Sequence, residues 1–244
     1  TEQVEADLER RREDEADGVA VLMIVDIDYF KHVNDTLGHL IGDRVLVETA
    51  ERLRRALGPD CLVARLGGDE FIVYRSGIEL MKDPTVDATA ILRAFAPSFN
   101  VMGEVFSSNV SIGLVASGDR IDDLDALMIK ADLALYKAKN SGKSQIQTFR
   151  EEMDTDYRYR QRLKADLKLT VAEGGLQLVY QPIVDLKSRR FVSCEALARW
   201  NHPELGPISP AVFIPIAEET GLVSDISRWV LASAAAECRN WPDD

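Results

Sequence analysis

The sequence predicts an α/β fold arranged in two successive units. A continuous apolar run at 19–25 is typical of a strand buried on both faces of a sheet. Further apolar runs alternate along the chain with stretches of helical periodicity, which is the pattern of α/β domains. The 244 residues are 46% hydrophobic and 29% charged, as in a globular chain with a substantial core.

In the first unit, residues 1–150, helices are predicted around a sheet. Gly38 interrupts one helical stretch that starts near Phe30, and the glycines at 67–68 separate two short apolar runs as in a hairpin. Strands are expected at 19–25, 61–66, 71–74, 101–106, 109–116 and 145–149, and helices at 1–17, from 30, and at 41–57, 85–95 and 124–139. We expect the strands at 101–106 and 109–116 to pair with each other.

A charge-rich stretch with apolar residues at helical spacing is predicted to connect the units over 151–172. The second unit then occupies 173–244. Its expected elements are strands at 176–184 and 190–198 and helices near 210–220 and 225–240.

Charge and cysteine content exclude several classes of protein. The net charge of −12 argues against broad binding to nucleic acid or to an anionic membrane. The longest apolar run, 19–25, is far shorter than the ~20 residues of a membrane-spanning helix. Three widely spaced cysteines without a CxxC pair favour a reducing compartment. We therefore expect a cytoplasmic chain with no nucleic-acid partner, although a longer parent protein could carry a membrane anchor.

Four carboxylates are candidates for one site. Asp26 and Asp28 end the apolar strand, and Asp69 and Glu70 lie at the tip of the predicted hairpin. If the hairpin pairs beside that strand, up to four negative charges converge, and a divalent cation such as Mg²⁺ is the usual counter-charge. Mg²⁺ in turn suits phosphoryl chemistry. The alternative is a solvated acidic turn in which the glycines serve only the turn geometry.

The strings around these carboxylates resemble the motifs of the GGDEF family, the bacterial diguanylate cyclases. The resemblance lies in residues 65–71 (RLGGDEF), 26–43 (DIDYFKHVNDTLGHLIGD) and 136–143 (YKAKNSGK), which follow the family's order. It implies a nucleotide-cyclase or palm-like sheet with flanking helices. The family's opening motif is missing, so the chain is expected to start inside the domain.

The resemblance also implies the cofactor and the reaction. Asp26, the carbonyl of Ile27, Asp69 and Glu70 would hold Mg²⁺ or Mn²⁺. Asp69 or Glu70 would help to deprotonate the ribose 3′-OH that attacks the α-phosphate of a second GTP. Two such steps release pyrophosphate and give cyclic di-GMP.

The substrate-binding residues implied by the resemblance fall into two groups. Asn34 and Asp43 would hydrogen-bond the guanine edge, which an amide and a carboxylate match and adenine does not. His39 would line the base pocket. The triphosphate would be bound by the backbone at Phe30 and Lys31 and by the side chains of Lys31, Lys139 and Lys143. Lys143 stands where the family usually has Arg, so we expect a weaker grip on phosphate.

The second unit resembles the start of the EAL family of cyclic di-GMP phosphodiesterases, which fold as TIM-like barrels. The resemblance lies in residues 178–184 (LVYQPIV), 195–200 (EALARW) and 210–222 (PAVFIPIAEETGL). It implies that Glu195 is a metal ligand and that Gln181 and Arg199 contact the dinucleotide. A TIM-type barrel needs roughly 250 residues, and the family's other metal-binding carboxylates are missing. We therefore expect an incomplete barrel without hydrolytic activity.

The favoured function is a diguanylate cyclase in a tandem GGDEF–EAL signalling protein. Since each monomer would bind one GTP, a homodimer is required for cyclisation. Two alternatives remain open. The parent protein could be a phosphodiesterase whose GGDEF unit is a GTP-binding regulator, or the chain could be a non-catalytic receptor or scaffold.

Overall fold

The computed structural model describes all residues except 1, 14–18, 78–82, 118–122 and 242–244. The chain divides into two compact units, Thr1–Thr155 and Asp156–Asp244, each of which combines helices with a sheet. The α/β fold that the sequence predicts is confirmed.

The first unit is built on a five-stranded mixed sheet with the order β2-β3-β1-β6-β7. Its central strand β1 (Val19–Ile27) is antiparallel to β3 (Glu70–Gly77) and to β6 (Val110–Ala116). The edges are β2 (Leu62–Gly67), antiparallel to β3, and β7 (Ile146–Thr148), parallel to β6. The hairpin β2–β3 therefore does pair beside the apolar strand.

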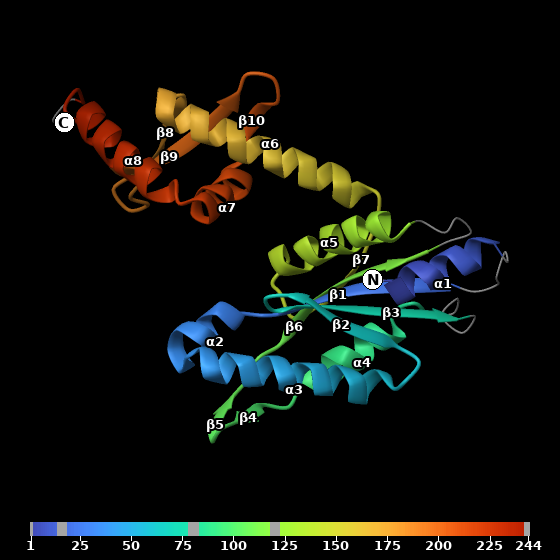
Figure 1. Cartoon of the computed structure of the whole chain (residues 1–244). Helices are drawn as coiled ribbons and strands as arrows, with labels where there is room; N and C mark the ends of the chain where they lie inside the picture. The colour runs from blue at the N-terminus through green and yellow to red at the C-terminus, as the bar shows by residue number, and fades with distance from the viewer. Residues whose placement is uncertain (1, 14–18, 78–82, 118–122, 242–244) are drawn as a thin grey trace. The chain divides into compact units, whose positions relative to one another are not determined.

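Helices cover both faces of this sheet, which explains the continuous apolar run of β1. Val21, Met23, Val25 and Ile27 point to one face and pack on one set of helices, while Ala20, Leu22 and Ile24 point to the opposite face. The first set comprises α2 (Phe30–Leu37), α3 (His39–Leu57) and α4 (Val86–Phe95), and the second comprises α1 (Glu2–Glu13) and α5 (Leu124–Asn140) (Figure 1). Residues 1 and 14–17 of the predicted first helix lie outside the described residues.

The pairing expected between 101–106 and 109–116 is wrong. Residues 99–106 instead form a small hairpin of β4 (Phe99–Val101) and β5 (Glu104–Phe106), separate from the main sheet. The chain reverses at Met102 and Gly103, which both have positive φ angles. Because the turn falls inside the predicted strand, β6 is left to pair with β1 and β7.

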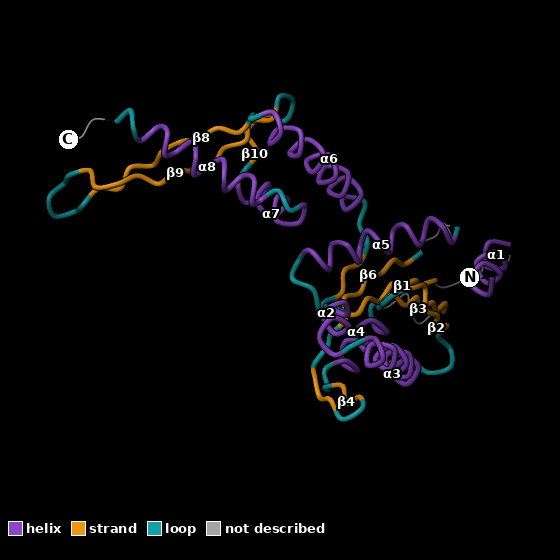
Figure 2. Tube along the Cα trace, turned by 60° about the vertical axis from the view of Figure 1, so that its left-hand side comes forward, coloured by secondary structure: helices purple, strands orange, loops and turns teal. Residues whose placement is uncertain are grey.

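The second unit consists of a three-stranded antiparallel sheet and three helices. The helices are α6 (Glu152–Glu173), α7 (Pro210–Thr220) and α8 (Val223–Cys238). The sheet has the order β10-β9-β8, and β8 (Leu176–Val184) and β9 (Phe191–His202) form its long hairpin (Figure 2). The short strand β10 (Gly206–Ile208) was not predicted, because three residues that include Gly and Pro have no strand pattern.

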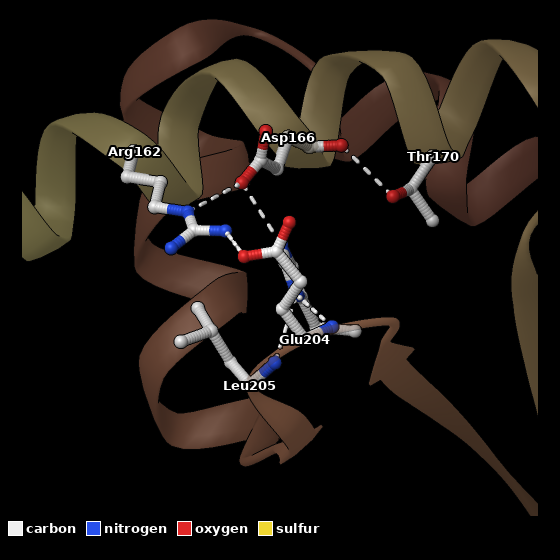
Figure 3. Close-up of polar contacts among 6 residues, drawn as sticks. Arg162, Asp166, Thr170, Glu204 and Leu205 are labelled. Atoms are coloured by element: carbon white, nitrogen blue, oxygen red, sulfur yellow. Dashed lines mark hydrogen bonds and ion pairs between the residues drawn. The ribbon is translucent and has the colours of Figure 1, made fainter.

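A polar cluster fixes the β9–β10 turn to α6. Buried His202 has its Nε2 at 2.9 Å from Asp166 Oδ2, and its Nδ1 accepts the backbone N–H groups of Glu204 and Leu205 at 3.1 Å each. Because Nδ1 acts as an acceptor, the ring proton of His202 is on Nε2. Arg162 bridges the carboxylates of Asp166 and Glu204 (Figure 3). Next to this cluster, Trp200 packs in the apolar core of the unit.

Gly113 on β6 gives a test of the packing of α5 against the sheet. A Cβ at Gly113 would lie 2.1 Å from the Ala131 carbonyl oxygen and 2.2 Å from the Leu135 nitrogen, which are backbone atoms that cannot rotate away. We expect Gly113→Ala to destabilise the unit by about 3 kcal/mol, and the neighbouring core change Ile112→Val by about 1 kcal/mol. Urea unfolding of the full chain measures both. Equal midpoints for the two variants would contradict this close packing.

Candidate functional site

The proposed metal-binding carboxylates converge where β1 ends beside the tip of the β2–β3 hairpin. Asp26 is the register partner of Glu70. The backbone N–H of Ile27 donates to the carbonyl oxygen of Asp69 at 3.3 Å. The hairpin tip itself is held by Arg65, whose guanidinium donates to the Gly68 carbonyl at 2.7 and 3.0 Å. The sheet therefore brings residues 43 positions apart in sequence together at one end of its central strands.

Asp26 interacts with each of the other charged groups at this end of β1. Its side chain is buried, and burial raises its pKa to about 6. Lys139, at the last turn of α5, opposes this increase through an ion pair of 2.7 Å, whereas the nearby charges of Asp69 and Glu70 add to it. A buried carboxylate with two acidic neighbours and one lysine remains short of positive charge.

This environment fits a divalent cation chemically. Carboxylates and the Ile27 carbonyl are the oxygen donors that Mg²⁺ prefers, and positive charge would favour the ionised form of Asp26. Among the described residues, however, no three His, Cys, Asp or Glu side chains form a preassembled metal cluster. The Ile27 carbonyl would therefore add to the carboxylates in the donor set.

Asp28 does not join this group, although the sequence suggests that up to four carboxylates converge. It is only 4% exposed. Its Oδ1 accepts from Ser111 Oγ at 2.7 Å, and its Oδ2 accepts from both the backbone N–H and the hydroxyl of Ser144 at 2.9 Å. Three hydrogen bonds satisfy a buried carboxylate without a metal. Asp28 instead ties the end of β1 to the segment that follows α5.

That segment carries Lys143, one of the proposed phosphate-binding residues. Lys143 and Ser144 both have positive φ angles, an uncommon conformation for non-glycine residues. The ammonium of Lys143 lies 3.6 Å from the centre of the Tyr29 ring, a cation–π contact. Tyr29 also has a positive φ and is 66% exposed. The contacts of Asp28 and Tyr29 therefore place Lys143 beside the loop between β1 and α2.

The other proposed nucleotide-binding residues lie on α2 and α3. Phe30 is buried and Lys31 exposed at the start of α2, with half-buried Asn34 one turn further on. His39 and Asp43 are exposed in the first turns of α3. Asp43 also lines a cavity of about 370 Å³ between α3 and the β2–β3 hairpin, whose other walls include Leu46, Val47, Ala50 and Phe71.

In the second unit, Gln181 and Glu195 are direct register partners on β8 and β9. Arg199 lies on the same face as Glu195, because side chains alternate along a strand. Gln181 and Glu195 are exposed and Arg199 is half-buried. The sheet thus presents these three residues on one surface.

Tyr29, Ser111 and Ser144 were missed by reasoning from the sequence. The aromatic ring and the two hydroxyls carry no pattern that separates them from ordinary loop and strand residues. The one available signal is Asp28 itself, which follows Asp26 by two positions at the end of an apolar strand and so needs hydrogen-bond partners if it is buried.

A family model described as diguanylate cyclase, GGDEF domain, matches residues 1–145. This chain belongs to the GGDEF family. A second model, the EAL domain, matches residues 164–244, so a GGDEF domain is followed here by part of an EAL domain. The resemblance seen in the motifs is thereby confirmed, and the arrangement is that of cyclic di-GMP signalling proteins.

Curated relatives align with this chain over both its GGDEF and its EAL parts. The bifunctional diguanylate cyclase/cyclic di-GMP phosphodiesterase MucR of Pseudomonas aeruginosa is 35% identical over 91% of this chain and 32% of its own length. The biofilm architecture maintenance protein MbaA of Vibrio cholerae is 34% identical over 96% of this chain and 31% of its own length. The chain spans 27% to 36% of the length of such curated relatives.

Solved structures confirm the fold of the GGDEF domain. The GGDEF domain of PA1120 (TpbB or YfiN) from Pseudomonas aeruginosa is 30% identical and superposes with a TM-score of 0.60, covering 64% of this chain and 90% of that one. An EAL/GGDEF domain protein from M. capsulatus is 38% identical with a TM-score of 0.52, covering 56% and 87%. In the described part of the chain, no helix combines the length and apolar character needed to cross a membrane.

The raised pKa of Asp26 predicts a trade-off between stability and function. Because the folded-state pKa of about 6 exceeds the ordinary 3.8, the ionised carboxylate costs stability above pH 6. Without divalent cations, we expect Asp26→Asn to be more stable than the native chain at pH 8, by about 1–3 kcal/mol. The difference should shrink as the pH falls from 6 to 4, since native Asp26 is then protonated.

Thermal unfolding at a series of pH values measures this difference. The matched control is Asp132→Asn, which removes an exposed carboxylate of the same helix that carries Lys139. We expect no such pH-dependent gain there. A less stable Asp26→Asn at pH 8 would show instead that the ion pair with Lys139 outweighs the cost of burial.

Proposed function

We propose that the GGDEF domain of this chain is a diguanylate cyclase that condenses two GTP molecules into cyclic di-GMP. The observation that carries the proposal is that buried Asp26 lies beside the acidic hairpin tip and pairs with Lys139 at the end of β1. Acidic oxygen donors beside a lysine suit a metal-bound triphosphate, because each anionic group then has a cationic partner.

The proposed roles follow from the positions of the residues. Asp26, the carbonyl of Ile27, Asp69 and Glu70 would hold Mg²⁺ or Mn²⁺, which neutralises charge on the phosphates during transfer. Lys139 can pair with phosphate once a metal ion replaces it as the counter-charge of Asp26. Lys143 lies beside the loop between β1 and α2, over the ring of Tyr29. Lys31 and the backbone at Phe30 complete the triphosphate-binding set at the start of α2.

Asn34, His39 and Asp43 would bind the base. They lie on two helices that meet at Gly38, and Asp43 lines the cavity between α3 and the hairpin. The chemical fit is to guanine, whose edge presents both donors and acceptors to a carboxylate and an amide.

In the proposed reaction, the ribose 3′-oxygen of one GTP attacks the α-phosphorus of the other. The bond to pyrophosphate breaks, and the 3′-proton passes to Asp69 or Glu70. Since one chain offers one such site, two copies must face each other, so the proposal includes a homodimer. The three cysteines are free, which fits the reducing cytoplasm as its location.

The EAL part supports a weaker proposal. Gln181, Glu195 and Arg199 share one face of the β8–β9 sheet, which fits binding of a dinucleotide and a metal in a whole protein that also hydrolyses cyclic di-GMP. A paired-metal hydrolytic site needs more carboxylates than Glu195 alone. We therefore propose synthesis, and not hydrolysis, on the basis of the site in the first unit.

The direct test is to incubate the full chain with Mg²⁺ and GTP and to quantify cyclic di-GMP by mass spectrometry. We expect activity per molecule to rise with protein concentration, because the active species is a dimer. Asp69→Asn should lower the rate by about 100-fold or more, since it removes a metal ligand or proton acceptor. The control Glu51→Gln removes an exposed carboxylate of α3 and should leave the rate unchanged.

Absence of cyclic di-GMP at every protein concentration would overturn the proposal. If GTP then still binds without being consumed, the domain is a GTP-binding regulator. If GTP does not bind, the receptor or scaffold alternative holds.

A further inference from the structure

Helices α2 and α3 pack closely against each other at Gly42. The turn between them is formed by Gly38, whose N–H donates to the Asn34 carbonyl at 3.0 Å and whose own carbonyl accepts the N–H of Gly42 at 3.2 Å. A Cβ at Gly42 would lie 1.9 Å from Asn34 Oδ1 and 3.0 Å from its Cγ. Both distances are below van der Waals contact, so the Asn34 amide occupies the space that any larger residue would need.

Helix propensity does not explain a glycine here. Gly42 lies in the first turns of a 19-residue helix and is buried. At such a position Ala is the more stable choice, because Gly loses more backbone freedom on folding. Gly42 does not have the positive φ that would require glycine. The remaining reason for glycine is the close approach of Asn34, with Phe30 Cζ as a second neighbour at 3.4 Å from the missing Cβ.

We propose that Gly42 is a specificity-determining position that sets where the Asn34 amide stands, and thereby selects guanine over adenine. The inference rests on the proposed function, in which Asn34 and Asp43 bind the base. Gly42 directly precedes Asp43 in the sequence. One turn of α3 therefore carries the Asp43 carboxylate and also the space above Gly42 that the Asn34 amide occupies. Guanine needs the amide and the carboxylate in one fixed arrangement, and a displaced amide would leave a buried polar group unpaired.

A double-mutant cycle tests this role. The variants are Gly42→Ala, Asn34→Ala and the combination of both, made in the full chain. The probes are the α,β-methylene analogues of GTP and ATP with Mg²⁺, which bind without turnover, and calorimetry gives their affinities. Melting temperatures of all four proteins report on folding.

We expect Gly42→Ala to weaken binding of the GTP analogue by about 10-fold, the loss of roughly one hydrogen bond that leaves its partner unpaired. Binding of the ATP analogue should not change, so selectivity falls. In the Asn34→Ala background, the further change Gly42→Ala should alter affinity by less than about 2-fold, because the clashing atoms are gone. There it should raise the melting temperature, since Ala is the better helix former.

Two results would overturn the inference. One is an equal loss for both analogues. The other is a loss of GTP-analogue affinity in the Asn34→Ala background as large as in the native one. Failure of the proposed base site looks different, because the native chain would then show no preference for the GTP analogue. Failure of the reaction alone leaves the analogue affinities unaffected, since they are measured without turnover. If the base site fails, the melting temperatures still decide on the contact, because Gly42→Ala should then raise the melting temperature more in the Asn34→Ala background than in the native one.

Discussion

The carboxylate of Asp26, buried at the end of the central strand, is the constraint on which the site depends. It is 5% exposed and pairs with Lys139 at 2.7 Å. To bury it there, the fold must place β3 on one side of β1, β6 on the other, and the last turn of α5 above the strand end. Each of these elements also supplies or positions a group of the proposed nucleotide site. The electrostatics of one residue and the topology of the first unit are therefore linked.

Much of this topology follows from sequence pattern. The apolar run of β1 predicts burial on both faces, and the structure has helices on both faces of the sheet. The two glycines between short apolar runs predict the β2–β3 hairpin, which forms. Pattern fails where a local turn decides the outcome. Met102 and Gly103 reverse the chain inside a run of strand-like residues, and positive φ at a methionine has no sequence signature.

The site divides in the same way. The convergence of Asp26 with the hairpin carboxylates follows from strand pairing and is predictable once the hairpin is placed beside β1. The fate of Asp28 is not, since its partners Ser111 and Ser144 are 83 and 116 positions away. Nor could pattern reveal that Lys139 pairs with Asp26 and Lys143 with an aromatic ring, because the first contact depends on how the end of α5 packs beside β1 and the second on the turn that follows α5.

The buried pair of Asp28 and Ser111, to which exposed Ser144 also hydrogen-bonds, has a consequence for the evolution of this domain. Loss of the Ser111 hydroxyl would leave a buried carboxylate short of a donor, while loss of the carboxylate would leave the buried Ser111 hydroxyl without its acceptor. Neither Asp28 nor Ser111 can change by itself without leaving a buried polar group unpaired. The two positions should change together or not at all, although they lie on separate segments and neither is assigned to the substrate.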